Sequence, residues 1–141
     1  MAREPLDVLL RLRRLAVQDQ MRALAAAIRA EEAALQEQAA RTETITRETA
    51  TIRSIAERDA TLAGFVAWRT RAVQALRAAE AQAAQASEET RMAYAALGDA
   101  RGAVRAVELG LDQRKAATEL AAQQSEQHSL DDATRRPGAA G

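Results

Sequence analysis

The sequence contains no cysteine, so disulfides, thiol catalysis and cysteine metal sites are excluded. It is also poor in aromatic residues and in proline: among 141 residues, only Phe65, Trp68 and Tyr94 are aromatic and two are proline. The hydrophobic fraction of 48% consists largely of 37 alanines, which bury little area each, so we do not expect a thick globular core. This composition favours long helices or a coiled coil.

Long hydrophobic runs are absent as well. The N-terminal segment MAREPLDVLLRLRRLAVQDQ has an apolar stretch that is too short for a signal peptide and is interrupted by arginines. No segment approaches the ~18 uninterrupted apolar residues of a membrane span. The 20 basic and 20 acidic residues cancel, which argues against a dedicated nucleic-acid binder. We therefore expect a cytoplasmic protein, with peripheral association with the inner face of the cell membrane as the most that the sequence allows.

Apolar residues recur with an alternating spacing of three and four in two long stretches, as in the seam of a coiled coil. The first stretch contains Leu10, Arg14, Val17, Met21, Leu24, Ile28, Glu31, Leu35, Gln38, Thr42, Ile45, Thr49, Ile52 and Ala56. The second contains Leu62, Val66, Arg69, Val73, Leu76, Glu80, Ala83, Ser87, Thr90, Tyr94, Leu97, Arg101, Val104, Glu108 and Leu111. Each stretch predicts one helix.

The segment ERDATLAGFVAW, residues 57–68, interrupts these helices with Asp59, Thr61 and Gly64. If the chain reverses here, seam residues pair so that their numbers sum to 121–122. That register sets Leu10 against Leu111, Val17 against Val104, Leu24 against Leu97, Ile28 against Tyr94, Ile45 against Leu76, and Arg14 against Glu108. Half of the sum is about 61, inside the interruption.

We therefore predict an all-α fold, a long antiparallel two-helix coiled-coil hairpin over residues 1–127. Its parts are a helix over 5–58, a turn over 59–64 and a helix over 65–127, and residues 128–141 form a flexible C-terminal tail. The alternative is one continuous helix that forms a homodimer.

The titratable residues do not form a catalytic pattern. His128 is the only histidine and lies in a polar segment. Adjacent carboxylates such as Glu31 and Glu32 point in different directions on a helix and are best explained as salt-bridge partners. We predict no enzyme activity, no cofactor and no metal site.

Two surfaces are candidates for partner contacts. Arg11, Arg13 and Arg14 give the N-terminal helix a positive bias, which is either an ordinary charged surface or a dock for an acidic protein surface or an anionic membrane. Phe65 and Trp68 are three residues apart, so they share a helix face, which Ala72 and Leu76 extend. This face either packs the end of the hairpin or anchors a partner.

Three segments of the sequence resemble the FliJ family of flagellar export proteins. They are PLDVLLRLRRLAVQDQ near the N-terminus, FVAWRTRAVQAL after the glycine-containing interruption, and LDQRKAATELAAQQSEQHSLDDATRR near the end. The resemblance covers nearly the whole chain as a pattern and extends more loosely to the stalk proteins of type III secretion injectisomes.

The resemblance implies an antiparallel two-helix coiled coil similar to the paired terminal helices of the rotary ATPase gamma subunit. Family members sit in the pore of the hexameric export ATPase FliI, contact the export gate protein FlhA and help to handle export chaperones. Carried over, the end of the hairpin with both termini would enter the ring, and its expected contact residues are Arg11, Arg13, Arg14, Arg114 and Lys115. The expected gate-binding face contains Phe65, Trp68, Ala72 and Leu76.

The expected function is therefore that of a non-enzymatic stalk of the flagellar type III export apparatus. An injectisome stalk, a generic homodimeric coiled-coil scaffold, and a nucleoid or membrane-surface binder remain as alternatives.

Overall fold

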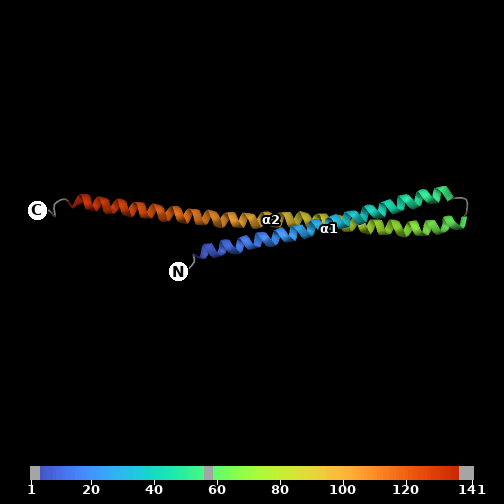
Figure 1. Cartoon of the computed structure of the whole chain (residues 1–141), viewed down its shortest axis with the longest axis horizontal. Helices are drawn as coiled ribbons and strands as arrows, with labels where there is room; N and C mark the ends of the chain where they lie inside the picture. Colours follow the sequence, from blue (N-terminus) through green and yellow to red (C-terminus); the bar gives the residue numbers. More distant parts are fainter. Residues whose placement is uncertain (1–3, 56–58, 137–141) are drawn as a thin grey trace. The chain divides into compact units, whose positions relative to one another are not determined.

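Two long helices make up the computed structural model, which describes residues 4–55 and 59–136. Helix α1 covers Pro5–Ile55 and helix α2 covers Asp59–Arg135 (Figure 1). The chain divides into two compact units, a central unit of residues 18–98 and a terminal unit of residues 1–17 and 99–141. Each unit contains a stretch of both helices. Over the described residues, neither helix is long and apolar enough to cross a membrane.

The predicted helical hairpin is confirmed, because contacts join the two helices within each unit. In the central unit the hydroxyl of Thr90 lies 3.2 Å from the carbonyl oxygen of Ala27 on α1. In the terminal unit Arg14 pairs with Glu108 at 3.4 Å, as the sequence predicted, and Arg114 pairs with Glu4. One continuous helix is incompatible with these contacts.

Helix α1 begins at Pro5, as predicted, because proline needs no hydrogen-bond partner for its nitrogen in the first turn. The amides of Asp7 and Val8 donate to the carbonyl oxygen of Glu4 at 2.9 and 3.3 Å. Asp7 also places a negative charge in the first turn, where it interacts favourably with the positive end of the helix dipole.

The predicted turn over 59–64 is wrong, since α2 already begins at Asp59. The ~1 kcal/mol cost of a helical glycine such as Gly64 is small enough for packing elsewhere to offset. The predicted end of the first helix at residue 58 lies outside the described residues.

The predicted flexible tail is wrong for residues 128–135, which continue α2. Extending an existing helix costs little free energy compared with nucleating a new one. In addition, the positive charge of Arg135 in the last turn interacts favourably with the negative end of the helix dipole. The helix ends one residue before Arg136, which precedes Pro137 and is therefore disfavoured in the helical conformation.

In the central unit, one line of α2 residues facing α1 consists of alanines. Ala79 and Ala86 are buried, and Ala72 and Ala93 are half-buried. The predicted seam instead used the residues one position later, of which Glu80, Ser87 and Tyr94 are exposed. The other seam line, which includes Leu76, Ala83, Thr90 and Leu97, is as predicted. Small residues let two helix backbones approach closely, which explains why alanines rather than larger neighbours occupy the interface.

The register of the two helices also differs from the prediction. Ala27 and Thr90 sum to 117, and Glu4 and Arg114 sum to 118, about one helical turn less than 121–122. The long side chains of Arg14 and Glu108 bridge this one-turn difference. In the observed register Leu24 is level with Ala93 instead of with Leu97, and Ile45 is level with Ala72, with which it lines a groove, instead of with Leu76.

A pair of cysteines should distinguish the two registers. We expect Ala27→Cys with Thr90→Cys to form an intramolecular disulfide readily on mild oxidation, because a contact joins these positions. The pair Ile28→Cys with Tyr94→Cys, which fits only the predicted register, should react more slowly. The chain has no other cysteine to interfere, and non-reducing gel mobility measures the product. Faster closure of the second pair would contradict the observed register.

Enlarging a buried alanine should separate the helices. Ala83 is only 3% exposed, so we expect Ala83→Leu to lower the free energy of unfolding by about 1–3 kcal/mol through overpacking. Ala84→Leu, at the adjacent exposed position, is the matched control and should leave stability nearly unchanged. Thermal unfolding followed by circular dichroism measures both, and equal effects would argue against a close-packed alanine line.

Candidate functional site

A groove of about 530 Å³ lies between the helices of the central unit and is open to solvent. We call it the aromatic groove because Trp68 forms part of its wall. Its lining residues are Glu37, Ala40, Arg41, Thr44 and Ile45 of α1, and Trp68, Arg71, Ala72 and Ala75 of α2. The groove thus combines an aromatic ring and small apolar residues with two guanidinium groups.

Trp68 is held in place by Phe65, one helical turn before it. The two ring centroids are 5.7 Å apart and the planes are inclined by 25°, a stacked arrangement. Both residues are half-buried, as are Ala72 and Leu76. The prediction that Phe65 and Trp68 share one face is confirmed, and Trp68 and Ala72 line the groove. Their role as a contact surface for a partner stays a prediction.

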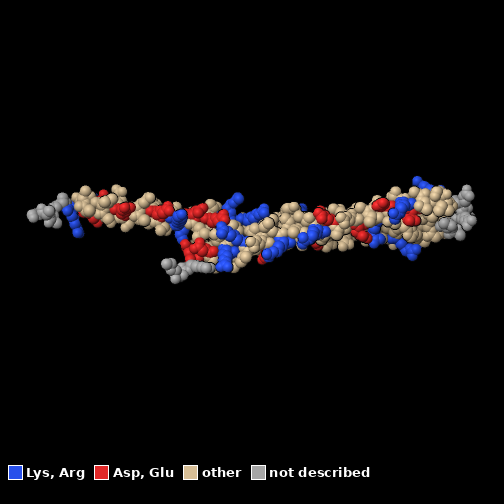
Figure 2. Space-filling view, viewed as in Figure 1, with Lys and Arg blue, Asp and Glu red and all other residues tan. Residues whose placement is uncertain are grey.

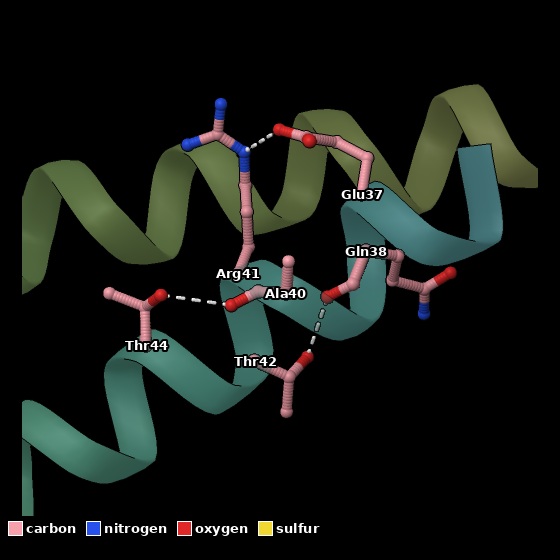
Figure 3. Close-up of polar contacts among 6 residues, drawn as sticks. All are labelled: Glu37, Gln38, Ala40, Arg41, Thr42 and Thr44. Atoms are coloured by element: carbon pink, nitrogen blue, oxygen red, sulfur yellow. Dashed lines mark hydrogen bonds and ion pairs between the residues drawn. The ribbon is translucent and has the colours of Figure 1, made fainter. Parts of the chain in front are cut away.

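The α1 wall of the groove is organised by local hydrogen bonds (Figure 3). Arg41 Nε donates to Glu37 Oε1 at 2.8 Å, one turn earlier on the helix. The hydroxyl of Thr44, which lines the groove, donates to the carbonyl oxygen of Ala40 at 2.9 Å, and the hydroxyl of Thr42, outside the groove, donates to that of Gln38 at 3.0 Å. Because these hydroxyls are satisfied by their own helix, the threonines present a less polar surface than their sequence indicates.

The two arginines of the groove, Arg41 and Arg71, were not predicted from the sequence as members of a site. Arg41 follows Glu37 by four residues, a spacing that predicts a local ion pair but not a place opposite Trp68. A pairing sum of 121 would set Trp68 level with Arg53, whereas in the structure Trp68 shares the groove with Thr44 and Ile45. Because the predicted register was wrong, it did not place these residues of α1 beside Trp68, and the groove was not predicted. Arg71 has no ion-pair partner among the residues that the structure describes.

Of the five basic residues predicted to contact a partner in the terminal unit, some form ion pairs within the chain and others do not. Arg14 and Arg114 form interhelical ion pairs with Glu108 and Glu4. Arg11, Arg13 and Lys115 are exposed and make no ion pair within the described parts of the chain. These five residues were the expected contacts of the ATPase ring, and two of them are engaged in ion pairs that join α1 to α2.

Acidic residues surround part of this cluster. A second groove of about 480 Å³ in the terminal unit brings Arg114 and Lys115 together with four carboxylates. Its lining residues are Glu4, Asp7, Leu111, Asp112, Arg114, Lys115, Thr118 and Glu119. Figure 2 shows acidic and basic side chains close together in this part of the molecule. The surface is therefore of mixed charge, and Arg11 and Arg13 on α1 are its least compensated cations.

One further ion pair, between Glu88 and Arg91, lies on the surface of the central unit. Arg91 donates from Nε to an oxygen of Glu88 at 3.0 Å, and this hydrogen bond lowers the pKa of the Glu88 carboxyl. Partial loss of hydration acts against the shift, and the positive charge of Arg91 adds to it. The pair lies on the solvent-exposed surface of α2 at a spacing of three residues, as in an ordinary helical ion pair. Among the described residues, no group of three or more His, Cys, Asp or Glu side chains is placed to hold a metal ion, and His128 is exposed.

The pair Arg14–Glu108 should behave as a structural contact. We expect Arg14→Glu to destabilise the fold slightly, and Arg14→Glu with Glu108→Arg to restore it, because the swap re-forms an opposite-charge pair. The side chains are 62% and 47% exposed, so the coupling should not exceed about 1 kcal/mol. A double-mutant cycle of urea unfolding midpoints measures it, and a swap that adds to the damage would exclude the pairing.

No protein-family model matches the chain, and the comparisons with curated proteins and with solved structures found no match either.

Proposed function

We propose that this protein is a non-enzymatic stalk of a type III protein export apparatus, of the flagellar kind. The observation that carries the proposal is the antiparallel hairpin of two long helices, the fold that the resemblance to the FliJ family implies. The proposal places the protein in the cytoplasm, where it would bind the hexameric ATPase FliI, the gate protein FlhA and export chaperones.

The dimensions of the terminal unit suit insertion into a narrow pore. Helix α2 continues beyond the first residue of α1, and residues 120–135 are exposed throughout (Figure 1). A single helix with its side chains is only about 10–12 Å wide. Arg11, Arg13 and Lys115 would then offer charge to the walls of the pore.

The mechanism follows from a mismatch of symmetry. A hairpin of two different helices has no six-fold axis, so it makes unequal contacts with the six subunits of a ring. Binding energy that differs between subunits favours different conformations in them, which is how a stalk could promote ring assembly and couple ATP hydrolysis to the gate. The aromatic groove, with Trp68, Arg41 and Arg71, offers a separate surface for the gate protein.

The test is the ATPase activity of FliI with increasing amounts of the purified protein. We expect stimulation, and we expect the triple variant Arg11→Glu, Arg13→Glu, Lys115→Glu to need about tenfold more protein for half-maximal effect, as for lost charge complementarity. The matched control is Arg29→Glu with Arg77→Glu, at exposed positions in the central unit. If the wild-type protein changes neither hydrolysis nor ring formation, the proposal fails.

A further inference from the structure

We draw no further inference here: the strongest candidate, the exposed apolar stripe of Leu109, Leu120 and Leu130 on α2 in the terminal unit, carries none, because nothing in the structure shows what covers it.

Discussion

The packing of bulky α1 side chains against a line of alanines on α2 is the constraint on which the rest of the structure depends. The small core of the central unit contains Ala79, Ala83 and Ala86. The large apolar residues that are buried in this unit are Leu24 and Leu97. A core of this kind is one side chain deep. It fixes the register, because a shift by one turn would set large residues against each other and open the alanine line to solvent.

The helical fold could be predicted because its signals are local. Composition and three-four spacing identify helices wherever they pack, and Pro5 marks a helix start without reference to any partner. The register of the two helices, by contrast, is not set by local signals. It was chosen by matching large residues such as Tyr94 with Ile28, but in a chain with 37 alanines almost any choice of seam meets small residues. Nothing local in the sequence shows that the alanines are the buried ones, and so the reversal was placed too late and Tyr94 was wrongly expected inside.

In the candidate sites, too, features that follow from local spacing could be predicted, and features that depend on the register of the helices could not. That Phe65 and Trp68 share one helix face depends only on their three-residue spacing and was predicted correctly, and the structure adds that their rings stack. The aromatic groove depends on which part of α1 lies opposite Trp68, so Arg41 and Arg71 were not foreseen. In the terminal unit the ion pair of Arg14 with Glu108 was predicted from the sequence, whereas the pair of Arg114 with Glu4 was not. The latter pair belongs to the observed register, in which the two helices are displaced by about one turn from the predicted one.

A thin core also changes what the exposed leucines mean. Because the hairpin is held by alanines on its inner faces, Leu109, Leu120 and Leu130 contribute little to its stability, and their cost is an apolar surface in water. A partner that covers this surface recovers that free energy, and two partners that cover the same surface compete for it.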